Sequence, residues 1–273
     1  GRTEAKAEAL YFWRADSTDL TYLIHAQQWE LNALNATVNL SLRHRYNKGG
    51  TSGNVLLESR SAAPGAANGY AWLRLTAINS NRKGPLELRT RFIAQYGSGA
   101  TPRESALYLA SASPEEMMEN KYVRSVGFVP YDWTGFGSGV NNFQQGGGLG
   151  LRGYAGYLAP ETDSDGNQVL TYAGNTGAAI NAELDLDGLV RFKPGKLGHT
   201  LHLDAYLFGD VGSMGYRRMD GAGTVQEFAE PRADAGAGFA LTIKRWGPLT
   251  DIKPLTIRFD MPLLLSALPA TET

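Results

Sequence analysis

Apolar and polar residues alternate with a period of two along several stretches of the chain. In residues 201–210, Leu203, Ala205 and Leu207 occupy odd positions, whereas His202, Asp204, Tyr206, Phe208 and Asp210 occupy even ones. Because successive side chains of a β-strand point to opposite faces, this period predicts a strand with one apolar and one polar face. The same pattern predicts strands at 38–45, 72–77, 86–95, 180–187, 235–244 and 255–261, with less regular candidates at 9–14, 20–29 and 55–60. The sequence therefore predicts an all-β, antiparallel protein of about ten strands.

Two all-β architectures fit this alternation: a soluble β-sandwich and a transmembrane up-and-down β-barrel. The predicted polar faces carry closely spaced charges, at Arg89 and Arg91, Glu183 and Asp185, and Arg258 and Asp260. Aromatic residues stand near the strand ends, at Tyr11, Trp13, Trp29, Tyr46, Tyr70, Tyr96 and Trp246. Charged interior faces and aromatic girdles are typical of membrane barrels, so the pattern favours the barrel over the sandwich.

Composition agrees with an all-β protein and excludes several other classes. The chain has 273 residues with 33 Gly and 13 Tyr, which is typical of a β protein with many turns. It has no run of 18 apolar residues, so we expect no transmembrane helix. A formal net charge of −1 without a basic stripe predicts no nucleic-acid partner. The absence of Cys excludes disulfides and thiolate metal sites and is compatible with an extracytoplasmic location.

The chain is expected to form one domain over residues 1–273. Short turn-like links at 47–53, 79–84 and 245–253 predict hairpins between neighbouring strands. By contrast, residues 97–177 contain many glycines, a short helix-compatible piece at 113–120 and few strand signals. A connection of that length is usually functional. In a barrel it could fold into the lumen.

Two local motifs resemble ligand sites but lack the required context. Residues 148–153 match the dinucleotide pattern G-x-G-x-x-G, yet no apolar strand precedes them and no long helix follows, so we expect no nucleotide. Residues 163–167 resemble the start of a calcium loop but lack its later glycine and glutamate, which indicates a polar turn. The histidines His25, His44, His199 and His202 form no metalloprotease spacing. We therefore predict no catalytic residue, metal or cofactor in this domain.

Two motifs and the tail resemble one family of membrane proteins. Leu151, Arg152, Gly153 and Tyr154 are similar to the (Val/Leu)-Arg-Gly-(Phe/Tyr) motif of the outer-membrane assembly-factor superfamily, which contains the BamA, TamA and two-partner-secretion barrels. Phe208, Asp210 and Gly212 resemble its Phe-x-Asp-x-Gly strand motif. Residues 236–239, 246–249 and 257–263 are similar to its penultimate strands. The resemblance covers about residues 86–263.

The resemblance implies a location, partners and a contact. It implies a barrel in the outer membrane of a Gram-negative bacterium, with lipid, lipopolysaccharide and a client or passenger protein as partners. In such proteins the motif loop enters the barrel from the extracellular side. Carried over, this means that Arg152 contacts Asp210, with Phe208 and Tyr154 nearby.

The chain departs from the family pattern after Leu263, where the sequence has no signal for a closing strand, so we expect a portion of a longer polypeptide. No pattern of periplasmic POTRA repeats is present either. The family role is protein insertion or translocation at the outer membrane. Two alternatives remain open: a barrel that anchors or exports a fused upstream enzyme, such as a zinc aminopeptidase, and a soluble β-sandwich binding module.

Overall fold

The protein is mostly β-structure, with ten strands in one antiparallel sheet. A computed structural model describes residues 1–13, 33–120, 147–155, 157–186, 188–189, 198–220, 223–244 and 254–268. The sheet order is β1-β2-β3-β4-β5-β10-β11-β13-β14, and β12 pairs with β11. Its strands are β1 (Arg2–Trp13), β2 (Leu34–Lys48), β3 (Thr51–Ala62), β4 (Tyr70–Lys83), β5 (Leu86–Gly99), β10 (Thr176–Asp185), β11 (Leu201–Asp220), β12 (Gly223–Phe228), β13 (Arg232–Ile243) and β14 (Leu255–Leu265).

Nine of the ten predicted strand regions lie in this sheet, whereas the candidate at 20–29 lies outside the described residues. The sequence pattern missed β12 and the second half of β11. Regular alternation of apolar and polar residues is lost after Gly212, where the sequence reads Ser-Met-Gly-Tyr-Arg-Arg, so periodicity gave no signal for this extension.

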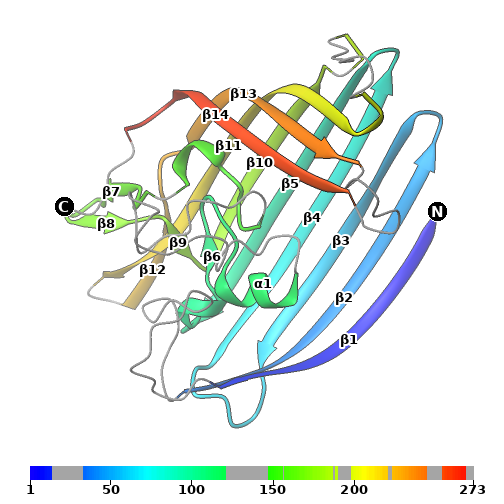
Figure 1. Cartoon of the computed structure of the whole chain (residues 1–273). Coiled ribbons are helices and arrows are strands. Elements are labelled where there is room, and N and C mark those ends of the chain that lie inside the picture. Colours follow the sequence, from blue (N-terminus) through cyan, green and yellow to red (C-terminus); the bar gives the residue numbers. More distant parts are fainter. Residues whose placement is uncertain are drawn as a thin grey trace, which may run out of the picture.

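The sheet is strongly curved and surrounds the described part of the chain between β5 and β10, within residues 100–175, which we call the central segment (Figure 1). Helix α1 (Pro114–Glu119) and strand β6 (Leu107–Tyr108) lie on its concave side. The two outermost strands, β1 and β14, are not paired with each other. The closed barrel expected from the sequence is therefore present only as a curved, open sheet in the described residues.

The two faces of the sheet have the polarity that the alternation predicts, with the apolar face exposed. On β11, Leu207 and Val211 are 48% and 42% exposed, whereas Phe208 and Asp210 are buried at 5% and 3%. Val211 lies opposite Ile180 in β10, so the apolar positions of neighbouring strands form one continuous outer face. Further exposed apolar side chains on the strands include Val38, Leu40, Leu42, Leu57, Leu73, Phe92, Ile180, Phe239, Ile257 and Phe259.

Tight turns join the strands at one end of the sheet. Gly49 and Gly50 have φ of 59° and 83° between β2 and β3, and Gly84 has φ of 61° between β4 and β5. Glycine adopts such positive φ values without a steric penalty. These hairpins confirm the predicted links at 47–53 and 79–84, although the strands extend further into them. The predicted link at 245–253 lies outside the described residues.

The long segment between β5 and β10 has its own short elements. Besides β6 and α1, these are η2 (Arg103–Ser105), η4 (Arg152–Tyr154), β7 (Pro160–Thr162), β8 (Gln168–Leu170) and β9 (Ala173–Gly174). The Ser113 hydroxyl accepts a hydrogen bond from the Glu116 backbone N–H at 3.1 Å and caps α1, which confirms the predicted helix. In the described parts of the chain, no helix is long and apolar enough to cross a membrane.

This segment supplies most of the apolar core of the protein. Leu107, Leu109, Leu149, Leu151 and Tyr154 pack with one another and with wall residues. The wall side chains in this cluster are Ile93 of β5, Ala179 of β10 and Met214 of β11. Apolar burial thus attaches the segment to the concave face, which is otherwise polar.

Two smaller predictions can be compared with the structure. Asp163 accepts hydrogen bonds from the backbone N–H groups of Asp165 and Asn167 at 3.0 and 2.7 Å, which confirms a polar turn at 163–167. Of the predicted interfacial aromatics, Tyr11, Trp13 and Tyr96 are exposed, whereas Trp29 and Trp246 lie outside the described residues.

Tyr46 and Tyr70 do not stand free at the strand ends. The Tyr46 hydroxyl donates to Asn79 at 2.8 Å. The prediction for Tyr70 was wrong: its side chain is buried, and its hydroxyl donates to Asn35 at 3.1 Å. Tyr70 shares a strand face with the buried Trp72, so it points into the concave side.

Candidate functional site

A glycine-rich turn places the motif segment against the backbone of residues 108–112. Gly147, Gly148 and Gly150 have φ of 79°, 48° and 77°. A Cβ atom at Gly148 would lie 2.3 Å from the carbonyl oxygens of both Ser111 and Tyr108. The turn therefore requires glycine for its dihedral angles and for its close approach to the neighbouring backbone.

The next residues continue this attachment and bring Arg152 to the wall. The backbone N–H of Leu149 donates to the Tyr108 carbonyl at 2.8 Å, and that of Leu151 donates to the Leu109 carbonyl at 3.1 Å. The side chains of Leu149 and Leu151 are fully buried. These two backbone hydrogen bonds and the two buried leucine side chains hold the chain in place directly before Arg152.

Arg152 forms a bidentate ion pair with Asp210 of β11. Its Nε and Nη2 atoms donate to the two carboxylate oxygens at 2.8 and 3.0 Å, and its backbone N–H donates to the same carboxylate at 3.2 Å. The Asp210 side chain is 0% exposed, and Asn181 of β10 donates to it at 3.1 Å. This is the contact that the sequence resemblance implies. Burial acts to lower the pKa of Arg152, but the hydrogen bonds to Asp210 and its charge raise it above the ordinary value.

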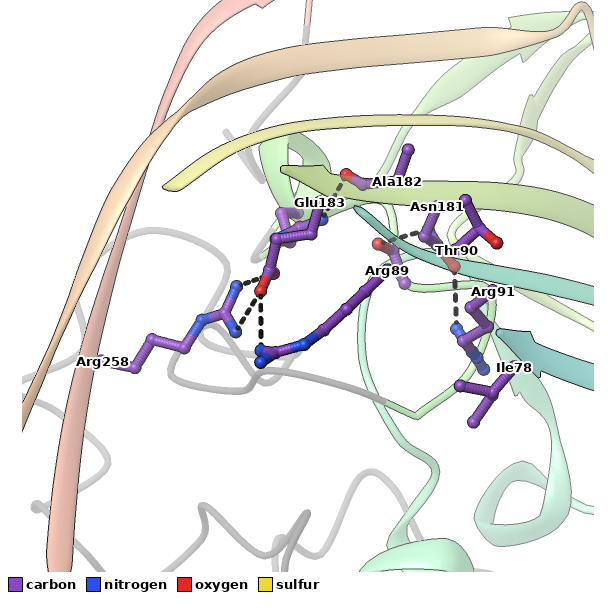
Figure 2. Close-up of a pocket in the computed structure, with 10 residues that line it drawn as sticks. Ile78, Arg89, Thr90, Arg91, Asn181, Ala182, Glu183 and Arg258 are labelled. Carbon is purple, nitrogen blue, oxygen red and sulfur yellow. Dashed lines mark hydrogen bonds and ion pairs between the residues drawn. The ribbon is translucent and has the colours of Figure 1, made fainter. Parts of the chain in front are cut away.

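A wider charge network surrounds this pair. Arg152 Nη1 lies 3.2 Å from Glu183 of β10 and 3.5 Å from Asp260 of β14. Arg258 contacts both of these carboxylates, and Arg89 lies 3.6 Å from Glu183. Figure 2 shows Arg89 and Arg258 converging on Glu183. The predicted polar-face charges of β5, β10 and β14 thus meet at one place, which no strand pattern could specify.

A cavity of about 320 Å³ opens beside this network (Figure 2). Arg89, Arg91, Arg152 and Arg258 line it together with Glu183. Arg91 donates to the carbonyl oxygens of Gly148 at 2.6 Å and Leu149 at 3.3 Å, so it also holds the glycine-rich turn. The charged groups are engaged with one another, which is typical of a structural network in a polar interior.

Phe208 lies beneath the Arg152 guanidinium. The Arg152 Cζ atom is 4.1 Å from the centre of the Phe208 ring, within the range of a cation–π contact. Phe208 is paired with Gly236 of β13, where a Cβ atom would lie 2.7 Å from the ring. The glycine therefore provides the space that the aromatic ring occupies.

Gly153 and Tyr154 extend the contact to β13 and β14. A Cβ atom at Gly153 would lie 2.4 Å from Leu265 and 2.7 Å from the Cβ of Asp234. The Tyr154 hydroxyl is 3.3 Å from the Ala267 carbonyl, and the Ala267 N–H donates to it at 3.1 Å. All four residues of the motif at 151–154 thus contact the wall or the apolar core.

Gly212, the last residue of the strand motif, faces Leu151. A Cβ atom at Gly212 would lie 2.7 Å from the Cβ of Ala179 and 2.9 Å from Leu151. The structure therefore brings together all seven residues singled out in the sequence, with Arg152 and Asp210 at the centre. It does not place His202 in this group, because His202 pairs with Asp204 at 2.7 Å further along β11.

Sequence reasoning missed Asp234, which lies directly opposite Asp210 in the β11–β13 register. Extending the alternation of β13 by one residue before Ala235 would have placed Asp234 on the inner face. It also missed the contacts of α1 with β3 and β4, for which the sequence has no pairing signal.

In the described ranges, no three His, Asp or Glu side chains are grouped so that they could hold a metal ion. Comparison of the chain with protein-family models and with curated proteins finds no match. The resemblance to the assembly-factor superfamily therefore rests on the two motifs and the tail of the sequence.

Proposed function

We propose that the chain is an outer-membrane β-barrel domain of the assembly-factor superfamily. In this proposal its outer face contacts lipid, its concave face forms a polar lumen, and the segment that carries Arg152 is a plug. The domain would act in the insertion or translocation of client proteins at the outer membrane of a Gram-negative bacterium.

The inverted polarity of the sheet is the observation that carries the proposal. Apolar side chains such as Leu207 and Phe259 are about half exposed, at 48% and 52%, while Asp210 and Phe208 on the opposite face are buried. In a water-soluble sheet protein the apolar face is buried against a second layer. A transmembrane barrel has the reverse arrangement, because lipid solvates the outer face.

Membrane insertion requires that the unpaired edges of the sheet, at β1 and β14, be closed. Unpaired strand edges leave backbone donors and acceptors that lipid cannot satisfy. A functional barrel therefore requires β1 and β14 to be joined directly or through further strands of the full-length protein.

The soluble β-sandwich alternative has less support. A sandwich requires a second sheet packed on the apolar face. Besides the large sheet, the described residues form two sheets of two strands each, β6–β9 and β7–β8. The β6–β9 strands belong to the segment between β5 and β10, which packs on the polar concave side.

Reconstitution of the full-length protein tests membrane insertion. We expect it to float with phospholipid vesicles in a density gradient and to resist extraction at alkaline pH. A soluble, monomeric protein in detergent-free buffer would contradict the proposal.

Transport requires a separate measurement. A vesicle assay should show client insertion or translocation that depends on the barrel, whereas an anchoring barrel would insert without such activity. If that result were found, the anchoring alternative, with a fused upstream enzyme, would replace transport as the function.

A further inference from the structure

The central segment is attached to the sheet at a second place, through α1. Glu115 and Glu119 of α1 form ion pairs with Arg60 of β3, the latter at 2.7 Å. Glu116 lies 3.9 Å from Arg74 of β4. These contacts lie at β3 and β4, whereas Arg152 contacts β10, β11 and β14.

The charges of the two attachments are reversed. Arg152 is a cation on the central segment that contacts carboxylates of the wall. In the second attachment the segment provides the carboxylates and the wall provides the guanidinium groups. Arg60 and Arg74 also lie 5.2 and 4.7 Å from the ring centre of Trp72, which orients both arginines toward α1.

Glu116 connects α1 to the glycine-rich turn. Its carboxylate accepts a hydrogen bond from the Gly148 backbone N–H at 3.1 Å. Gly147 is also packed on Ala112, with an added Cβ atom only 2.3 Å away from the Cβ of Ala112. The two attachments are therefore adjacent in space, although 32 positions separate Glu116 from Gly148, and they use separate wall residues.

The two attachments bury different apolar side chains. Helix α1 has six residues, and a helix of that length is unstable unless it is docked. Helix α1 buries Pro114 and Met117, but neither belongs to the apolar cluster that holds the motif segment. Leu149, Leu151 and Tyr154 of that cluster directly flank Arg152.

We propose that α1 is a separately releasable latch, which can detach from Arg60 and Arg74 while Arg152 remains bound to Asp210. This inference goes beyond the proposed function and does not depend on membrane insertion. In a membrane barrel, release of α1 would uncover the lumenal face of β3 and β4 without removing the whole segment.

Removal of Arg60 should release the latch. Arg60→Gln leaves the buried Glu115 carboxylate without its partner, which is strongly destabilising for a buried pair. The double variant Arg60→Gln with Glu115→Gln removes both charges, so we expect it to restore docking. This restoration would separate a loss of charge pairing from a general failure to fold.

Spin labels can report the two parts of the segment independently, since the chain contains no Cys. One label is placed on α1 at Met118→Cys, where the side chain is exposed. The other is placed on the β7–β8 hairpin at Ser164→Cys, an exposed position beyond the motif. The full-length protein is measured by electron paramagnetic resonance in detergent.

We expect Arg60→Gln to increase label mobility at Met118→Cys several-fold and to leave Ser164→Cys unchanged. Arg82→Gln is the control, because Arg82 is an exposed arginine of β4 that pairs with Glu87. An unchanged α1 label would overturn the proposal. So would equal mobilisation of both labels, or a double variant that stays as mobile as Arg60→Gln.

Discussion

Asp210 and Asp234 lie directly opposite each other on β11 and β13, and both side chains are buried. Asp210 accepts three hydrogen bonds from Arg152, whereas the ion pairs of Arg152 in the described residues do not include Asp234. Of these two neighbouring acidic side chains, Asp210 is the one paired with Arg152. Their contributions to the attachment of the segment should have opposite signs.

Asn substitutions at the two positions test this asymmetry. Asp234→Asn removes a buried acidic group beside Asp210 while keeping the side-chain shape, so we expect an increase in stability of about 1 kcal/mol. Asp210→Asn removes the partner of Arg152 and should lower stability by about 3–5 kcal/mol. Chemical denaturation of the two variants in detergent measures both changes, and equal destabilisation would contradict the argument.

Arg152→Ala should weaken the attachment of the central segment. It leaves Asp210 buried without its cation, which costs about 3–5 kcal/mol. We expect a lower melting temperature and faster proteolysis of the motif segment. Arg82→Ala is the matched control, because its exposed ion pair should contribute less than about 1 kcal/mol. Unchanged melting and proteolysis in Arg152→Ala would show that the ion pair does not hold the segment.

Two glycines of β11 allow a steric prediction. At Gly212 a Cβ atom would lie 2.7 Å from Ala179 and 2.9 Å from Leu151, whereas at Gly209 the nearest atom is 3.7 Å away. Gly212→Ala should therefore displace the motif segment and cost about 1–3 kcal/mol. Gly209→Ala should change the melting temperature little. Similar effects of the two substitutions would argue against close packing at Gly212.

Docking of α1 should depend on pH through Glu115. Burial raises the pKa of Glu115 to about 7, against the lowering effect of Arg60. The ion pair with Arg60 therefore offsets only part of the cost of burying an ionised Glu115, and docking is strongest when Glu115 is protonated. Because the docked pKa exceeds the undocked value, this stabilisation is present below about pH 4.5 and is lost as pH rises through 7. The groups that face Glu115 are Arg60 of β3, Tyr70 of β4, Glu104 and Ser105 of η2, and Glu119 of α1.

The mobility of a label at Met118→Cys measures this dependence. We expect at least roughly tenfold weaker docking at pH 8 than at pH 5, since one pKa unit corresponds to a tenfold change in the equilibrium. Glu115→Gln should be docked similarly at both values, because its side chain does not titrate. A pH response that persists in this variant would assign the effect to another group.

A charge on the outer face tests contact with lipid. Leu207→Arg places a cation on the exposed apolar face, which costs about 2–4 kcal/mol near the middle of a bilayer. We expect lower folding yield into phospholipid vesicles. Gln168→Arg, on the exposed β7–β8 hairpin, should not affect insertion. If Leu207→Arg inserts as well as Gln168→Arg, the face does not contact lipid.

Much of the sheet could be predicted because strand faces are encoded locally. Alternation identified β5, β10, β11, β13 and β14 and the side of each strand that carries charge. The contact of Arg152 with Asp210 was implied by motif resemblance. Asp234 was not predicted as an inner-face residue because the regular alternation begins at Ala235, one residue later. Tyr70 was predicted on the wrong face because an aromatic residue at a strand end can face either side of the sheet.

By itself, the sequence determined the β class, the inner and outer faces of most strands, and the two motifs that contain Arg152 and Asp210. These features depend on the period of apolar residues and on short runs of sequence. Only the tertiary structure decided which charges meet. Three contacts join residues that are far apart in the chain: Arg152 with Glu183 and Asp260, Asp210 with Asp234, and α1 with Arg60. Register and sheet curvature set these contacts, and neither is encoded in the local alternation of side chains.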